Sequence, residues 1–375
     1  GQIAVAAGRD VRLLNRQAVV FTTGLPQPLP ITANLSTGRN AFVADGNLIQ
    51  SPLLAHGRGI DISALRDVQG VSDASTPQYG VDWWWRSGSI IDPSADTYWY
   101  SRYDKFQQGF ATFGGGNLAV RAGRDISDVE ASTPANGRIA GRRSDAESTP
   151  DSGSQNSGGA ISFEAGRDIV AGFVLAGGQQ AQLLAGHSIR ANADPKIVNK
   201  AVQVLHGDTD IRAQTRRDLK LGHIAAAGLT SPTKQTGLTN SFPNYLIAGL
   251  TPNAQLRASS AAGDLSIGGD RPEYAKAGAN PVGNVGNNVM PDQIWLASPN
   301  GSINLAYSTI QAPVRASSFR ALARDNLKVS DLYVTGSQQS MAGPNSIGIT
   351  KLGDDLKVFG RLAASAWTQG PLNPI

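Results

Sequence analysis

Short runs of alternating apolar and polar residues, each ending at a turn that contains Gly, recur along the chain. Ile3, Val5 and Ala7 alternate with other residues before the sequence Gly-Arg-Asp-Val, and residues 118–126 and 161–169 repeat this arrangement. Alternation with a period of two places the apolar side chains on one face of a β-strand. Strands of about three to five residues cannot bury a face alone, so each run needs a neighbour to pack against.

Diverged copies of the phrase Ala-Gly-Arg-Asp-(Ile or Val) divide the chain into units. These copies lie at residues 53–62, 183–189, 202–211, 215–221, 262–267, 300–305, 323–329 and 352–358. We expect the Gly to turn the chain through a positive φ and the Asp to accept hydrogen bonds from amides in the turn. The turns at Gly166 and Gly186 are separated by about 20 residues, the length of one coil in a β-solenoid.

The pattern therefore predicts an all-β chain that forms a parallel β-helix, with a single domain over residues 1–375 and large loop excursions. Coils stacked at about 4.8 Å pair every strand with the coils above and below it. A β-sandwich would instead show longer strands joined by Asn-Gly hairpins. A β-propeller would show a constant period of about 40 residues with an aromatic signature in each blade. The chain shows neither pattern.

Four stretches interrupt the repeats. Residues 127–160 are rich in Ser, Gly, Pro and charge, which predicts a flexible loop. Residues 229–254 and 268–293 are rich in Pro, Asn and Gly and predict long loops. Residues 79–113 differ because they hold almost half of the Trp, Tyr and Phe residues of the chain.

We consider two roles for the aromatic stretch 79–113. The rings can form a small core that packs an excursion against the coils, or a recognition surface that stacks on sugars while charged side chains donate hydrogen bonds. Three consecutive Trp residues cannot all point inward from one strand, so we expect at least one at the surface. The candidate ligand-binding residues are Trp83, Trp84, Trp85, Arg86, Trp99, Tyr100, Arg102 and Tyr103.

Composition supports strands and tight turns. Charged residues make up 17% of the chain and Gly contributes 43 of 375 residues, whereas surface helices need many Glu, Lys and Arg. The chain has no Cys, which excludes disulfides and thiolate metal sites. The net charge of +4 is spread without blocks of like charge, so we expect no nucleic-acid partner. No apolar run reaches the roughly 18 residues of a membrane-spanning segment.

The recurring Arg-Asp pair has a structural explanation. Asp can accept hydrogen bonds from turn amides while Arg reaches carbonyl groups or acids of the next coil. Stacking then aligns these pairs along one edge of the solenoid. We expect such a corner ladder to comprise Gly8, Arg9, Asp10, Gly123, Arg124, Asp125, Gly166, Arg167 and Asp168.

Signals for catalysis or metal binding are weak. Enzymes that hydrolyse polysaccharides place two carboxylates together, and Asp92, Asp96 and Asp104 in the aromatic stretch are the acids that we consider for such a pair. The four His residues adjoin Gly at predicted corners, and the chain shows no zinc, calcium or phosphate-binding motif. We therefore expect no enzymatic activity, no catalytic residue, no metal and no cofactor.

The Ala-Gly-Arg-Asp phrases at 7–11, 122–126 and 165–169 resemble the repeats of filamentous haemagglutinin-type exoproteins. These are the large secreted proteins of bacterial two-partner (type Vb) secretion, and the resemblance covers most of the chain outside the interruptions. It implies a right-handed parallel β-helix, export through an outer-membrane transporter partner, and a location outside the cell or at its surface. Residues 299–301 (Pro-Asn-Gly) only echo the motif of the family's secretion domain, so we expect an internal or C-terminal segment.

The resemblance also implies a role in adhesion, biofilm formation, contact-dependent competition or virulence. In this interpretation, the loops bind a glycan or a protein on a host or bacterial cell. Two alternatives stay open, namely a β-helical polysaccharide lyase or hydrolase and a passive rod-like spacer. The lack of Cys suits export through the oxidising periplasm, because the unfolded chain cannot form disulfides there.

Overall fold

The computed structural model describes the coil strands, their corners and part of the excursions. The described residues are 1–27, 43–44, 47–48, 53–71, 83–87, 97–139, 155–156, 158–194, 201–226, 234–235, 254–268, 288–291, 293–311 and 318–333. Within these ranges the chain is all-β, and one turn of 3-10 helix at Tyr103–Lys105 (η1) is the helical element. No helix in these ranges has the length and hydropathy needed to span a membrane.

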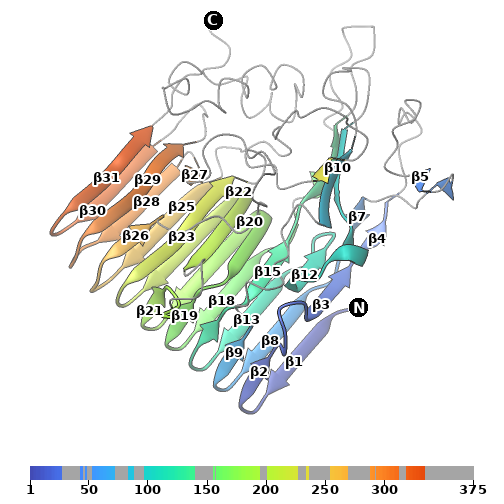
Figure 1. The fold of residues 1–375 in the computed structure, drawn as a ribbon, viewed down its shortest axis with the longest axis horizontal. Coiled ribbons are helices and arrows are strands. Elements are labelled where there is room, and N and C mark those ends of the chain that lie inside the picture. The colour runs from blue at the N-terminus through green and yellow to red at the C-terminus, as the bar shows by residue number, and fades with distance from the viewer. Residues whose placement is uncertain are drawn as a thin grey trace, which may run out of the picture.

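The strands wind into coils that run along three faces of a stack (Figure 1). The first face contains β1 (Ile3–Ala7), β8 (Ile60–Ala64), β13 (Leu118–Ala122), β18 (Ile161–Ala165), the second halves of β20 (Phe173–Ala185) and β22 (Val202–Thr215), β25 (Gln255–Ser260), β28 (Gln293–Ser298) and β30 (Ser318–Ala323). The second contains β2 (Asp10–Arg12), β9 (Asp67–Gln69), β14 (Ile126–Ser127), β19 (Asp168–Val170), β21 (Ser188–Arg190), β26 (Leu265–Ile267) and the first halves of β23 (Leu219–Ala226), β29 (Ile303–Gln311) and β31 (Leu327–Tyr333). The third contains β3 (Val19–Thr23), β12 (Gly109–Phe113), β15 (Glu130–Thr133), β27 (Asn288–Met290), the first halves of β20 and β22, and the second halves of β23, β29 and β31.

Strands on the same face pair in parallel and in register. On the first face, Ile60 pairs with Ile3 on one side and with Leu118 on the other. The alignment continues from Leu118 to Ile161 and then to Ala181. Equivalent apolar side chains therefore stack in columns along the interior. This arrangement confirms the predicted all-β parallel β-helix.

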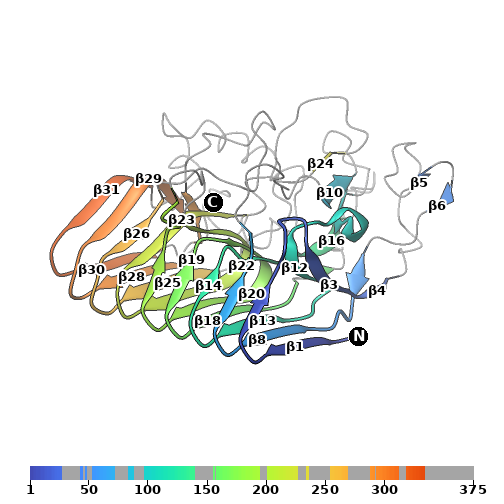
Figure 2. The same ribbon diagram turned by 60° about the horizontal axis from the view of Figure 1, so that its bottom comes forward.

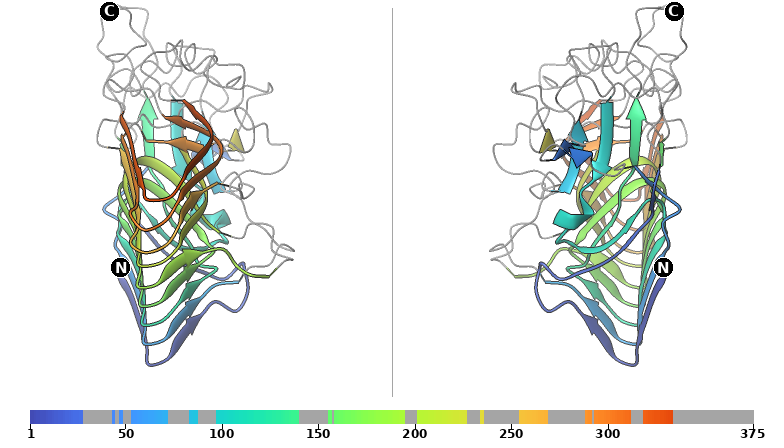
Figure 3. Two further views of the ribbon diagram at one scale, coloured as in Figure 1. Left: turned by 90° about the vertical axis from the view of Figure 1, so that its left-hand side faces the viewer. Right: turned by 90° about the vertical axis from the view of Figure 1, so that its right-hand side faces the viewer.

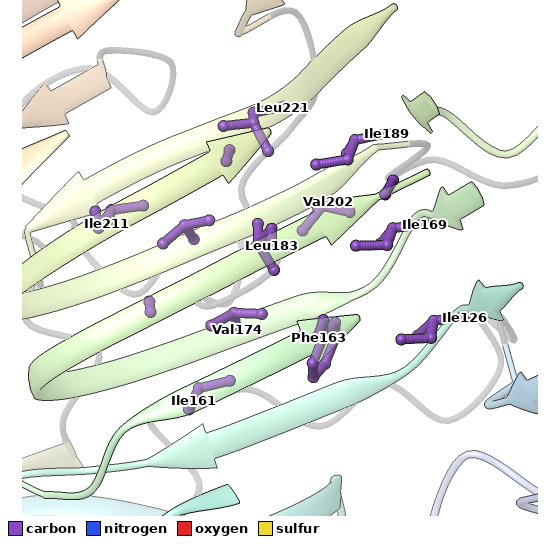
Figure 4. Packing of buried hydrophobic residues seen from close by; sticks show 14 of the residues in the cluster. Ile126, Ile161, Phe163, Ile169, Val174, Leu183, Ile189, Val202, Ile211 and Leu221 are labelled. Carbon is purple, nitrogen blue, oxygen red and sulfur yellow. The ribbon is translucent and has the colours of Figure 1, made fainter. Parts of the chain in front are cut away.

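The apolar columns form one continuous core. On the second face, Ile126, Ile169 and Ile189 lie on successive coils, as Figure 4 shows. All three are fully buried, and they belong to a cluster that extends from Ile60 to Leu305. The hydrophobic effect therefore acts along the whole stack rather than within separate units.

The Gly residues of the corners permit a close approach between coils. A Cβ atom on Gly123 would lie 2.1 Å from the carbonyl oxygen of Leu65, and one on Gly166 would lie 2.2 Å from the carbonyl oxygen of Gly123. Neither of these Gly residues has a positive φ, so the predicted reason for Gly at the corners is wrong. The short distance between coils selects Gly here, because any side chain would meet the backbone of the neighbouring corner.

Part of the predicted flexible loop 127–160 belongs to the coils. β15 is buried on the third face and pairs with β12 and β20. Thr133 Oγ1 donates a hydrogen bond to the carbonyl oxygen of Gly159 (2.8 Å). The prediction was wrong for this part because small hydroxyl side chains can be buried when a neighbouring strand accepts their hydrogen bonds. Residues 140–154 lie outside the described ranges.

Other predicted boundaries also change. The aromatic stretch 79–113 ends within the coils, because β12 is a strand of the third face. Of residues 229–254 the structure describes Ala254 and a short strand, β24 (Lys234–Gln235). Residues 268–293 include β27 and the first residue of β28, whereas 269–287 lie outside the described part. Four further short strands form antiparallel pairs, β4 (Leu25–Pro26) with β7 (Leu54–Ala55) and β5 (Val43–Ala44) with β6 (Asn47–Leu48).

Candidate functional site

Two strands of the aromatic stretch belong to a small second sheet beside the coil stack. Its strand order is β17 (Gln155–Asn156), β16 (Asn136–Ile139), β11 (Thr97–Ser101), β10 (Trp84–Ser87) and β24. β10 and β11 are antiparallel, with Trp85 opposite Tyr100, and Trp99 of β11 lies opposite Gly137 of β16. In Figures 1 and 2 this sheet lies near β12, on the side away from the Gly-Arg-Asp corners.

Most of the described rings of this stretch are packed together. Trp83, Phe106 and Phe113 contact one another edge to face, with ring centroids 5.0 to 5.9 Å apart. Trp83 is 0% exposed. Phe113 belongs to β12 and points away from the coil interior, so the cluster joins the excursion to the outer side of the third face. Edge-to-face rings in this distance range are a favourable aromatic arrangement.

Hydrogen bonds hold the two buried indole groups in place. Trp83 Nε1 donates to Gln108 Oε1 (3.0 Å), and Trp84 Nε1 donates to the carbonyl oxygen of Ala135 (3.2 Å). Because the indole N–H groups have protein partners and the rings are buried, these two Trp residues are not available to a ligand. The packing role therefore describes Trp83, Trp84 and Tyr100, all of which are buried.

The remaining candidates of the aromatic stretch have different surroundings. The structure describes the backbones of Trp85, Arg86 and Trp99 in paired strands, and their side chains lie outside what it describes. Tyr103 is 42% exposed at η1 and its ring contacts Phe21. Among the side chains that the structure describes, the stretch is therefore mainly a packing cluster, with Tyr103 at its surface.

The charge of Arg102 is matched locally. Its Nε and Nη2 atoms donate to the two carboxylate oxygens of Asp104, at 2.8 and 2.6 Å. This bidentate hydrogen bond holds the pKa of Asp104 below its usual value and raises the pKa of Arg102. A bidentate pair of this kind leaves little unbalanced charge for a ligand.

The predicted corner residues align along one edge of the stack. Arg66 donates to both carboxylate oxygens of Asp10 (2.8 and 2.7 Å), and Arg124 Nε donates to Asp67 Oδ1 (2.8 Å). Arg167 and Asp125 continue the series. Each of these Arg residues thus reaches the Asp of the preceding coil, whereas the expected partner was on the next coil.

The corner Asp residues also accept hydrogen bonds from the coil that follows. Asp168 Oδ1 accepts from the amide of Ser188 (3.1 Å), and His187 Nδ1 lies 3.0 Å from the same oxygen. Burial of the Asp168 carboxyl opposes its ionisation, but the hydrogen bonds from Arg190, His187 and the Ser188 amide, together with the charge of Arg190, outweigh burial and hold the pKa of Asp168 below the usual value. The ladder joins coil to coil, which is a structural role.

A second group of aromatic and charged residues lies on the solvent side of the first face. These residues occupy equivalent positions on neighbouring parallel strands. Arg212 lies opposite Arg257, Arg257 lies opposite Trp295, and Trp295 lies opposite Arg320. Trp295 is 42% exposed, and Arg257 and Arg320 are also exposed. We call Arg212, Arg257, Trp295 and Arg320 the Arg-Trp strip. It runs across β22, β25, β28 and β30, which lie side by side in Figures 1 and 2.

A polar row runs parallel to the Arg-Trp strip, two residues earlier in each strand. Its members are Asp210, Gln255, Gln293 and Ser318. Arg212 Nη2 donates to Asp210 Oδ2 (2.8 Å), and Arg257 Nη2 donates to Gln255 Oε1 (2.8 Å). The two rows together provide a flat aromatic ring flanked by guanidinium, amide and hydroxyl groups.

The Arg-Trp strip was not predicted from the sequence, although a signal for Trp295 was present. Trp295 lies between Ile294 and Leu296, which both point into the core. Strict alternation therefore places Trp295 on the outside of its strand. Its neighbours across the sheet depend on how the coils stack, so the grouping with Arg257 and Arg320 required the structure.

The acids considered for a catalytic pair lie only partly within the described residues. Asp104 pairs with Arg102, and Asp92 and Asp96 lie outside the described ranges. A search of those ranges for three or more His, Asp or Glu side chains that could hold a metal found no such group.

The comparisons with known proteins give no relative for this chain. No protein-family model matches it, and neither the curated proteins nor the solved structures include a match.

Proposed function

We propose that this chain is a stiff β-helical segment of a secreted bacterial surface protein of the filamentous haemagglutinin type. Its function is to hold binding surfaces away from the cell, in adhesion, biofilm formation or contact-dependent competition. The observation that carries the proposal is the in-register stack of Ala-Gly-Arg-Asp corners along one edge. Such a stack is rigid because each coil is bonded to both neighbours through backbone and side chains.

Export through an outer-membrane transporter partner is part of the proposal. The absence of Cys in the sequence and the coil-by-coil pairing of the strands both support this route. A chain that emerges unfolded can add one coil at a time, because each coil needs only the preceding one to pair with. The proposed location is the medium or the bacterial surface.

Retention on cells tests the proposed function. We expect the purified, fluorescently labelled chain to bind bacterial or epithelial cells saturably, and an excess of unlabelled chain to displace it. Absence of saturable retention on every cell type tested would contradict the display role and favour a passive spacer.

Turnover assays distinguish display from catalysis. We expect no steady release of reducing or unsaturated sugars when the chain is incubated with a panel of polysaccharides. Sustained product release, proportional to the amount of chain, would contradict the proposal and favour a β-helical lyase or hydrolase.

A further inference from the structure

We propose that the Arg-Trp strip binds a linear anionic polysaccharide lying along the axis of the coil stack. The strip belongs to the coils rather than to the excursions, so the inference adds a specific ligand class and site to the display role. It rests on that role for its biological purpose only. The site itself lies entirely on the surface of the first face.

The exposed ring of Trp295 provides an apolar surface on which a sugar can stack. A Trp ring placed on a flat sheet surface leaves a large apolar area in contact with water, which costs free energy unless a ligand covers it. The flat faces of pyranose rings carry C–H groups that stack on indole rings. Trp295 is flanked across the sheet by Arg257 and Arg320, so a sugar on this ring lies between two guanidinium groups.

The balance of charge changes along the first face. Near its beginning, Arg121 Nη1 lies 2.8 Å from Asp61 and its Nε lies 3.7 Å from Glu164. Arg257 and Arg320 form no ion pair among the described residues, whereas Arg212 is paired with Asp210. The strip therefore carries unbalanced positive charge next to an exposed Trp. Guanidinium groups bind carboxylates and sulfates in a bidentate manner, which indicates an anionic polymer.

The spacing between coils suits the repeat of a polysaccharide. Equivalent residues on neighbouring coils are separated by about 4.8 Å along the stack axis. A sugar unit in an extended polysaccharide advances by a comparable distance, so successive units can face successive coils. The polar row of Gln255, Gln293 and Ser318 runs in the same direction, and its members are bonded to their neighbours: Ser318 Oγ donates to Gln293 Oε1 (2.5 Å) and Arg257 Nη2 donates to Gln255 Oε1 (2.8 Å). A polymer along the axis thus meets one ring and two cations in register.

Binding of defined polymers to the full chain tests the strip. The probes are polygalacturonate, which carries carboxylates, dextran sulfate, which carries sulfates, and neutral dextran. We expect at least one anionic polymer to bind, with an affinity that falls as salt is added, and neutral dextran to bind much more weakly. The relative affinity of the two anionic polymers identifies the preferred acid group.

Substitutions locate the site. We expect Trp295→Ala to weaken binding about tenfold or more. We expect the double variant Arg257→Gln with Arg320→Gln to weaken binding to the same degree and also to make the affinity less dependent on salt. Arg121→Gln is the matched control, because it removes one Arg from the same face outside the strip, and we expect it to change affinity by less than about twofold. Circular dichroism melting curves check that all variants fold.

Several outcomes would overturn the inference. Unchanged affinity of a folded Trp295→Ala variant, or an equal loss in Arg121→Gln, would show that the strip is not the site. Tighter binding to a DNA duplex of matched charge than to either polysaccharide would show a general response to anions. If the wild-type chain is retained on cells and strip variants are retained equally well, the display role stands and the strip inference fails.

Discussion

At the scale of single residues, the corner Gly positions provide a direct test of close packing between coils. We expect Gly166→Ala to lower the free energy of unfolding by about 1 to 3 kcal/mol, because its Cβ would collide with the carbonyl oxygen of Gly123. Gly8→Ala is the matched control, since nothing lies within 4 Å of a Cβ at that position. Denaturant titration of both variants measures the difference. Equal stability of the two would contradict the close-approach argument.

A buried His makes stability depend on pH. Burial of His223 on the third face lowers its pKa from 6.5 to about 4. Between these two values the unfolded chain takes up a proton that the folded chain excludes. The neutral, buried His223 therefore contributes its full share of the folding stability above pH 6.5, and this share is lost as the pH falls toward 4. The loss across this window is about 3 kcal/mol. Denaturant titrations at several pH values give the free energy of unfolding as a function of pH. Below pH 6.5 we expect this free energy to fall less steeply with pH in His223→Gln than in the wild type, and an equally steep fall would contradict this assignment.

At the scale of elements, the aromatic cluster fixes the small sheet against the third face. We expect Trp83→Ala to destabilise the chain by about 3 to 5 kcal/mol, because it empties a fully buried site and leaves Gln108 without its indole partner. Tyr103→Ala serves as the control within the same cluster and should cost much less, since this ring is partly exposed. Thermal or chemical unfolding distinguishes them. A cost for Trp83→Ala no greater than for Tyr103→Ala would count against a core role.

The same elements show what could be predicted from sequence. The coils were predictable because alternation and corner turns are local signals, visible within each repeat. The packing of Trp83 was not, because it depends on apolar residues far away in sequence that point outward from the third face, such as Leu175 and Leu205. The continuous apolar run at Phe173–Leu175 was a usable signal, since strands buried on both sides lose their alternation.

At the scale of the whole molecule, the two ends of the described stack differ from its middle. β1 pairs only with β8, and β31 only with β29, among the described strands. Figure 3 shows the stack from the side of its last coils and from the side of its first coils. Val5 of the first coil and Leu327 and Val329 of the last are exposed, whereas the equivalent middle positions are buried. In a solenoid of this kind, coils with one neighbour open more readily than coils with two.

Hydrogen exchange measures how readily each coil opens. We expect backbone amides of β20 and β22 to exchange more slowly than those of β1 and β31, because the middle coils open only when their neighbours also open. Uniform protection from β1 to β31 would show instead that the stack unfolds as a single cooperative unit.

The most direct test of the stack is a series of distances along its axis. The chain has no Cys, so spin labels can be placed at Asp61 and, in turn, at Arg212, Arg257 and Arg320, which occupy equivalent positions on the first face. With a spacing of about 4.8 Å per coil, pulsed electron paramagnetic resonance should give about 19, 24 and 34 Å, apart from a constant offset for the label. Distances that do not rise with the number of intervening coils would contradict the parallel β-helix.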